Sequence, residues 1–168
     1  MNDNDLFHKL AEALETELKV YQHLTDVCRQ EKEALIAVHN EEIRKTAHAK
    51  EALFQKIHQI DAERDLLARE LCRQLGLKPE PPRLKELVQK AQGTLGARLT
   101  ALQTGLELEI QKIQELNTMN GRLIEAALEN VRGALGSIRG TLAEKPVYKK
   151  EGRVETKTLS GQFVSREA

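Results

Sequence analysis

The chain is poor in the residues that most all-β folds require. Among its 168 residues there is no tryptophan, aromatic residues make up 3%, and only four prolines occur. This composition disfavours the many short strands and tight turns of a sandwich or barrel. Charged residues reach 31%, which is typical of long amphipathic helices with solvated outer faces. We therefore expect an all-α fold.

The sequence also lacks an excess of charge of either sign. Lysine plus arginine and aspartate plus glutamate both number 26. Proteins that bind nucleic acids or membrane surfaces normally carry a basic excess, so neither partner is expected. No apolar run approaches the ~18 residues of a membrane span, and the first residues do not resemble a signal peptide. We expect a soluble, cytoplasmic protein in which Cys28 and Cys72 stay reduced.

Patterns that carry enzymatic chemistry are missing as well. A di-metal helical bundle needs Glu-x-x-His on two helices, and among the residues three positions before each histidine only Asp5 is acidic. The sequence contains no His-Glu-x-x-His or Cys-x-x-Cys motif, and no glycine-rich phosphate loop after a strand. We therefore expect no metal, no cofactor and no enzymatic activity.

What the sequence does contain is helical periodicity. Apolar residues recur at three- and four-residue spacings, and breaks in this pattern separate helices predicted at about residues 4–38, 41–75, 83–92 and 95–142. Asn40 is expected to cap the second helix, Gly76 to end it, and Thr94 to cap the last helix. The short joint at His39 and Asn40 predicts an antiparallel hairpin.

The predicted architecture is an elongated antiparallel helical hairpin or coiled-coil bundle, with three long helices and one short helix. Residues 1–143 form the bundle, and residues 144–168 form a flexible C-terminal tail because the periodicity stops there. Glu17 and Glu31 interrupt the apolar seam of the first helix. The second helix is expected to turn the following residues inward: Ile43, Ala47, Phe54, Ile57, Ile60, Leu67, Leu71 and Leu75. Such seams close within one chain or across two, so monomer and homodimer are both open.

The last long helix carries the pattern with the most bearing on function. Asn117 and Asn120 stand at the head of an apolar stripe that keeps to about a third of the helix circumference. The stripe consists of Ile124, Leu128, Val131, Leu135, Ile138 and Leu142. A buried amide in a helical seam usually fixes register or partner choice. The stripe therefore indicates a protein-recognition surface, and the two amides face either a partner or the protein's own core.

Six glycines fall within the same predicted helix: Gly96, Gly105, Gly121, Gly133, Gly136 and Gly140. Each costs the helix about 1 kcal/mol relative to alanine. The last three share a face almost opposite the apolar stripe. Two interpretations remain open. The glycines mark a tolerated, weak helix end, or they form a groove for a close partner helix in a segment that melts and re-forms on binding.

These residues resemble the FlgN-type flagellar export chaperones. The distinctive element is Asn117-x-x-Asn120-x-x-Leu123-Ile124-x-x-x-Leu128, which is followed in the tail by Tyr148-x-x-x-Gly152. Weaker agreements occur at Glu31-x-x-Ala34-Leu35, Lys50, Arg64 and Leu75-Gly76. Gly121 and Ala127, next to the fixed positions of the motif, make this helix weaker than the family pattern requires.

The resemblance implies a small cytoplasmic chaperone without cofactor or enzymatic activity. Such chaperones hold the two hook–filament junction proteins unassembled and deliver them to the flagellar export apparatus, with its gate and ATPase. The predicted protein-binding residues are Asn117, Asn120, Leu123, Ile124, Leu128, Val131, Leu135, Ile138, Leu142, Tyr148 and Gly152. By the same resemblance, Tyr148 docks to the export gate. The alternative is a structural coiled-coil adaptor or stalk component of an export assembly, which holds no client.

Overall fold

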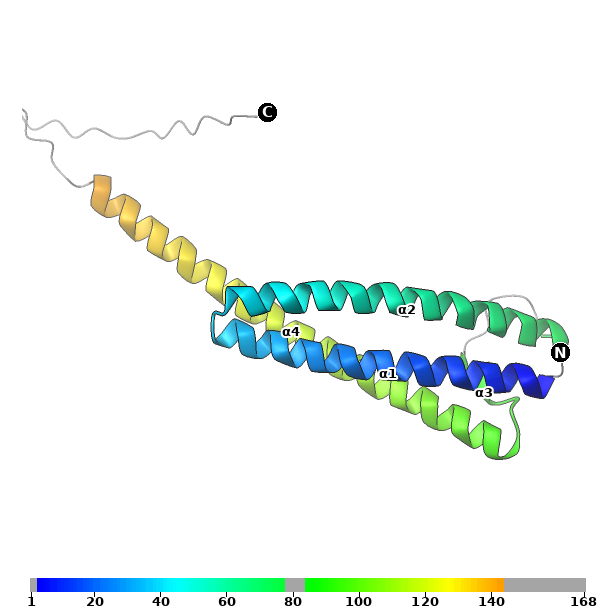
Figure 1. The fold of residues 1–168 in the computed structure, drawn as a ribbon. Coiled ribbons are helices and arrows are strands. Elements are labelled where there is room, and N and C mark those ends of the chain that lie inside the picture. The colour runs from blue at the N-terminus through cyan, green and yellow to red at the C-terminus, as the bar shows by residue number, and fades with distance from the viewer. Residues whose placement is uncertain (1–2, 78–83, 144–168) are drawn as a thin grey trace, which may run out of the picture. The chain divides into compact units, whose positions relative to one another are not determined.

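The computed structural model describes residues 3–77 and 84–143 of the chain. These residues form four helices: α1 (Asp3–Ile36), α2 (Asn40–Gln74), α3 (Leu84–Val88) and α4 (Gly93–Ala143) (Figure 1). The described ranges contain no strand, so the predicted all-α fold with three long helices and one short helix is confirmed. None of these helices combines the length and the apolarity needed to cross a bilayer.

The chain divides into two compact units, residues 1–123 and 124–168, and α4 contributes to both. The predicted division into a bundle over 1–143 and a tail over 144–168 stays a prediction, because 144–168 lies outside the described residues. The two units are described separately below.

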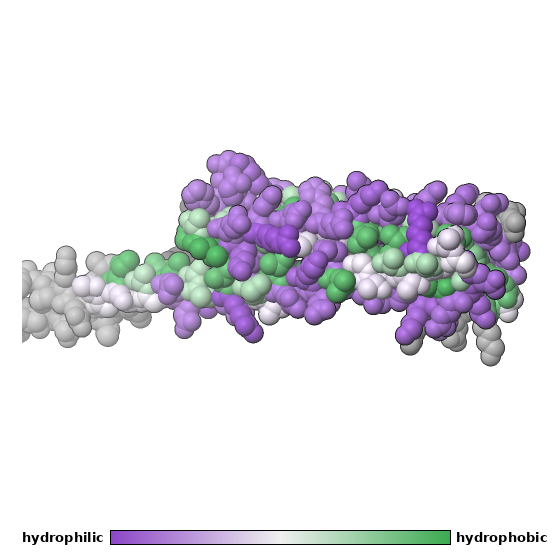
Figure 2. Space-filling model, turned by 90° about the horizontal axis from the view of Figure 1, so that it is seen from below, coloured by the Kyte–Doolittle hydropathy of each residue, from purple (hydrophilic) through white to green (hydrophobic). Residues whose placement is uncertain are grey.

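In unit 1, α1 is the central helix. It turns back into α2 as an antiparallel hairpin, and the first part of α4 runs along its other side (Figure 1). α1 has fourteen buried residues, whereas α2 has six, because α1 is covered from two directions. Hydrophilic side chains predominate on the face of unit 1 seen in Figure 2. Many of the charged residues of the sequence therefore lie on solvated outer faces.

The core of unit 1 consists of two apolar clusters. The first joins the start of α1 to the end of α2, to α3 and to α4, through Leu6, Leu10, Leu14, Leu71, Leu87 and Leu99 among others. The second lies nearer the hairpin joint and includes Val20, Leu24, Cys28, Leu53, Ile57, Ile60 and Ile113. Burying each such leucine or isoleucine contributes about 1.5–3 kcal/mol. Cys28 and Cys72 are both buried and unpaired, as predicted.

The joint between α1 and α2 ends α1 two residues earlier than expected. The His39 amide donates to the Ala34 carbonyl oxygen at 2.9 Å, and the Val38 amide donates to the Leu35 carbonyl oxygen at 3.3 Å. This is the Schellman arrangement, in which one residue adopts a left-handed backbone. Here that residue is Val38, at φ 54°. The prediction that Asn40 caps α2 is wrong, because Asn40 is already helical and His39 precedes it without a side-chain cap.

The end of α2 and the start of α4 both depend on glycines. Gly76 adopts φ 65°, and the Leu77 amide donates to the Cys72 carbonyl oxygen at 2.9 Å, so the predicted end of α2 is confirmed. Gly93 adopts φ 64° and begins α4 two residues before the predicted start. Thr94 therefore lies inside the helix, and its predicted capping role is wrong. The short helix α3 is confined to Leu84–Val88 rather than residues 83–92.

The inner face of α2 differs from the predicted one at Phe54. Its side chain is exposed, and Leu53 is buried instead. Ala47 is exposed for the same reason, while Thr46 is buried. Lys50 lies on this same face and pairs with the buried Glu31 carboxylate, so the inner face runs through Thr46, Lys50 and Leu53.

Candidate protein-binding site

A polar layer fastens α4 to the hairpin in unit 1. Asn120 is 2% exposed, and its Nδ2 donates to the Cys28 carbonyl oxygen at 3.0 Å and to Glu31 Oε2 at 2.7 Å. Lys50 Nζ donates to the same Glu31 oxygen at 2.7 Å and to Asn117 Oδ1 at 3.2 Å. We call these four side chains the Glu31 layer. It joins three helices through charge-assisted bonds, which are stronger than neutral ones.

The Glu31 layer favours one of the two roles left open for the asparagines. Both amides face the protein's own hairpin rather than pairing with each other, and Asn117 also accepts a weak bond from Cys28 Sγ at 3.6 Å. The Asn120 Nδ2 finds both of its acceptors in this alignment only, although its Oδ1 is buried without a hydrogen-bond partner, and such a buried amide fixes the register of a helical seam. Asn120 thus sets how α4 lies on α1, whereas Asn117 bonds the hairpin but stays exposed. Direct contact of either asparagine with a partner stays a prediction. Leu123, at the end of unit 1, is half-buried.

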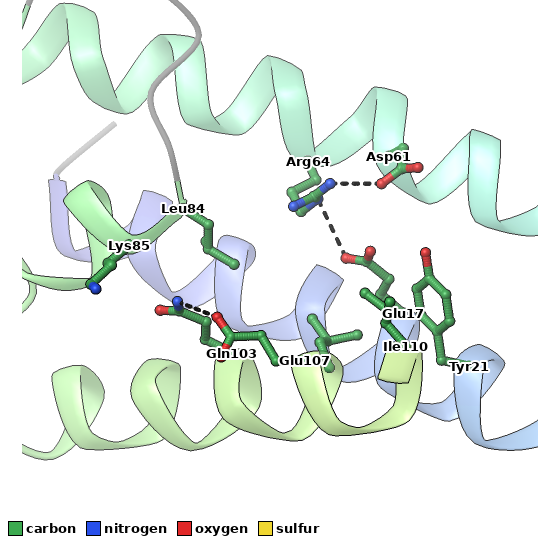
Figure 3. Close-up of a pocket in the computed structure, with 10 residues that line it drawn as sticks. Glu17, Tyr21, Asp61, Arg64, Leu84, Lys85, Gln103, Glu107 and Ile110 are labelled. Atoms are coloured by element: carbon green, nitrogen blue, oxygen red, sulfur yellow. Dashed lines mark hydrogen bonds and ion pairs between the residues drawn. The ribbon is translucent and has the colours of Figure 1, made fainter. Parts of the chain in front are cut away.

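A second polar layer lies closer to the start of α1. Glu17 is 4% exposed, and its Oε2 lies 3.3 Å from Arg64 Nε on α2. Arg64 also bonds Asp61 Oδ1 at 2.7 Å (Figure 3). Burial raises the pKa of Glu17, and although the Arg64 charge opposes this shift, it does not cancel it. We call these three side chains the Glu17 layer.

The sequence contains a signal for these pairs that helical periodicity alone does not show. Glu17 and Glu31 interrupt the apolar seam of α1, and Arg64 and Lys50 are weak matches to the family pattern. In an antiparallel hairpin, facing residues have numbers with a constant sum, and both pairs sum to 81 (17 with 64, 31 with 50). Two buried acids with basic partners at one shared sum would have predicted the hairpin register.

The apolar stripe predicted to bind protein lies on α4 in unit 2. Five of its side chains, Ile124, Leu128, Val131, Leu135 and Ile138, are each between 42% and 57% exposed. We call these five the apolar ridge. Apolar surface is visible on the segment of α4 at the left of Figure 2. The ridge spans 14 residue steps, or about 21 Å at 1.5 Å per residue. Monomeric proteins seldom expose a continuous apolar line of this kind unless something binds to it.

Five of the seven glycines of α4 fall into two groups. A Cβ atom on Gly96 would lie 2.6 Å from the Ala91 carbonyl oxygen, and one on Gly105 would lie 3.2 Å from Leu18 Cδ2. In unit 2, a Cβ atom on Gly133, Gly136 or Gly140 would meet nothing within 4 Å. The first two glycines allow close packing in unit 1, whereas the other three have no such role in the described structure.

Three of the predicted contact residues cannot be placed. Leu142 belongs to α4, but its side chain lies outside the described residues, and so do Tyr148 and Gly152. In the described ranges, no group of three or more histidine, cysteine, aspartate or glutamate side chains could hold a metal ion. The prediction that the chain has no cofactor stays a prediction.

Comparison with known proteins agrees with the features of α4. A search of curated proteins and a search of solved structures each gave no match. The family model described as "FlgN protein" matches residues 1–156, which is most of the chain. The match includes both polar layers and the apolar ridge. The chain therefore belongs to the FlgN family of flagellar export chaperones.

Proposed function

We propose that this chain is a cytoplasmic chaperone that holds hook–filament junction proteins unassembled and delivers them to the flagellar export apparatus. Membership of the FlgN family supports the general role in export. The particular clients and the delivery step come from the resemblance of the Asn117 to Leu128 motif. The apolar ridge is the surface we assign to the client.

The observation that carries this proposal is the exposure of the ridge. Five large apolar side chains line one side of a helix, and each leaves about half of its surface accessible. An amphipathic client helix can cover such a line with its own apolar residues at positions i, i+3, i+4 and i+7. Proteins that polymerise through amphipathic helices need this cover, because the same helices would otherwise associate early.

The open glycines suit a chaperone that must also release its client. Gly133, Gly136 and Gly140 weaken the helix that presents the ridge by about 1 kcal/mol each. Part of the interaction energy is then used to order this helix, which lowers the affinity without removing contacts. Tyr148 and Gly152 are assigned to docking at the export gate, on the family resemblance alone.

The proposal is tested by co-purification of hook–filament junction proteins with the full chain and with a chain lacking residues 131–168. We expect the full chain to form a stable complex and the truncated chain to form none, because the truncation removes three of the five ridge residues. Circular dichroism serves as the control, since unit 1 should keep its helices. Undiminished client binding by the truncated chain would overturn the site assignment. If neither chain binds a client but both bind the export apparatus, the chain is an adaptor.

A further inference from the structure

One side of the apolar ridge is charged, and its charges follow a definite order. Ile124, Val131 and Ile138 are seven residues apart, and each is followed directly by a charged residue, in turn Glu125, Arg132 and Arg139. Residues seven apart fall on one line along a helix. We call these three exposed side chains the charged column. The column is acidic at the start of the ridge and basic toward its end.

The other side of the ridge presents no charge to a partner. The residues that directly precede the last four ridge residues are uncharged: Ala127, Asn130, Ala134 and Ser137. The Ser137 hydroxyl donates to the Gly133 carbonyl oxygen of its own helix at 3.1 Å, and the Thr141 hydroxyl donates to the Ser137 carbonyl oxygen at 2.6 Å. Selection by charge at the ridge therefore depends on the charged column.

A client helix that covers the ridge meets the charged column with its own flank. Opposite charges on facing flanks stabilise a helix pair, and like charges destabilise it. The matching client therefore places a basic residue opposite Glu125 and acidic residues opposite Arg132 and Arg139. Read from its N-terminus at intervals of seven residues, an antiparallel client has the order acid, acid, base. A parallel client has the order base, acid, acid.

The helix dipole distinguishes the two directions. Acidic side chains stabilise the first turn of a helix and basic side chains the last turn, so the antiparallel order suits the client helix and the parallel order opposes it. The ridge is about four turns long, so its outer charges face the end turns of a client of that length. α4 ends at Ala143, shortly beyond Ile138, and the end of a helix carries partial negative charge. The partially positive start of an antiparallel client would lie at this end.

We propose that the ridge binds its client helix in the antiparallel direction. It selects a helix that carries acidic residues beside its apolar stripe and, seven residues after the last of them, a basic residue. This proposal rests on the proposed function, because the client is held at the ridge in both. Family membership and the exposure of the ridge give neither this direction nor this order of charges.

The test is titration calorimetry of the full chain with two synthetic peptides at low ionic strength, where exposed charges are least screened. Both peptides carry the same apolar stripe, and both have glutamine at the flank position that faces Arg139. The acid-first peptide has glutamate opposite Arg132 and, seven residues later, lysine opposite Glu125. The base-first peptide has this glutamate and lysine exchanged. We expect the wild type to bind the acid-first peptide at least ~5-fold more tightly.

A charge reversal in the column separates direct pairing from the helix content of the peptides. Glu125→Arg/Arg132→Glu keeps the composition of the chain but reverses the order of charge, so this variant should bind the base-first peptide more tightly. Arg122→Glu/Glu129→Arg is the matched control, because it reverses an exposed pair with the same seven-residue spacing on the far side of α4. The control variant should keep the preference of the wild type.

A nitroxide label at the N-terminus of the acid-first peptide reports the direction itself. We expect it to broaden the NMR signals of α4 amides near Ile138. Broadening near Ile124 would overturn the antiparallel direction. Equal affinity of the wild type for both peptides, or an unchanged preference in Glu125→Arg/Arg132→Glu, would overturn the selection by charge.

The outcome for the peptides is distinguishable from the outcome for the proposed function. If neither peptide binds but junction proteins still co-purify with the full chain, the direction and the charge order are wrong and the chaperone role stands. If neither peptide binds and no junction protein co-purifies, both proposals are wrong.

Discussion

The buried acids of α1 are the residues that shape unit 1 most specifically. Glu17 and Glu31 interrupt an apolar seam, and each forms an ion pair with a basic residue of α2. Removing one partner of such a buried pair usually costs more than the pair contributes. These pairs therefore act chiefly by rejecting other hairpin alignments, in which a carboxylate would be buried without a base.

The titration of Glu17 gives a prediction with a definite sign. Burial raises its pKa in the folded protein above the unfolded value of about 4.3. The folded state then binds more protons than the unfolded state, so stability falls as the pH rises from about 4.3 through the folded pKa. Glu17→Gln cannot titrate. We expect the wild type to lose stability relative to Glu17→Gln as the pH rises from the unfolded pKa through the raised folded pKa, as measured by urea unfolding at each pH. A difference that stays constant or moves the opposite way would contradict the burial effect.

Val38 offers a test of backbone strain. It adopts φ 54° and is 72% exposed, so its side chain gains little from burial. The left-handed conformation costs a residue with a Cβ atom about 1–2 kcal/mol, and glycine recovers this at an unfolded-state cost of about 0.4–1 kcal/mol. Val38→Gly should therefore raise the free energy of unfolding by about 0.5–1 kcal/mol, measured by urea denaturation.

Val38→Ala is the matched control for this change, because it shortens the side chain but keeps the Cβ atom. We expect it to gain clearly less stability than Val38→Gly. Equal effects of both variants would show that the side chain, rather than the backbone conformation, sets the stability of the joint.

At the scale of helices, the sequence predicts which helices exist and in what order, but it predicts less well which face of each helix is buried. The end of α2 at Gly76 is visible in the sequence because glycine marks a left-handed residue. α1 ends earlier than its periodicity predicts, because a valine occupies the position where glycine is expected. Phe54 was placed inward because apolar spacing alone does not show that Lys50 must reach Glu31. An ion pair between two helices is a tertiary contact, and the periodicity of a single helix cannot predict it.

The glycines of α4 lead to a prediction at this scale. Gly96→Ala would force a Cβ atom against the Ala91 carbonyl oxygen, and such overpacking costs about 1–3 kcal/mol. The triple change of Gly133, Gly136 and Gly140 to alanine meets open space and should gain about 1 kcal/mol of helix preference per site. We expect a lower melting temperature for Gly96→Ala and more helical circular dichroism for the triple variant.

Client binding by the triple variant decides between the two interpretations of the glycine face. Retained or tighter binding would mean that the glycines only weaken the helix, since a more stable helix requires less ordering. Lost binding in a well-folded variant would mean that a partner helix packs closely against the glycine face. A loss of helix in the triple variant would contradict the open space around these residues.

At the scale of the whole chain, the family, the all-α fold and the apolar stripe were all predictable from the sequence. The roles of the paired asparagines were not, because the same amides could fix an internal register or a partner's register. For Asn120 the structure distinguishes these roles by burial, which periodicity does not report: Asn120 of α4 is buried against α1, whereas the ridge residues are about half exposed. The residue that fixes register and the ridge to which we assign recognition thus lie on neighbouring segments of one helix.

The central claim is that the apolar ridge binds a client, and titration calorimetry with a hook–filament junction protein tests it most directly. The variant Val131→Gln/Leu135→Gln changes two ridge residues, and Ala126→Gln/Asn130→Gln places the same side chains on the opposite side of α4. If the ridge holds the binding hot spots, the ridge variant should bind at least ~30-fold more weakly than the wild type, and the control variant should bind equally well. Equal affinity of the ridge variant and the wild type would contradict the account.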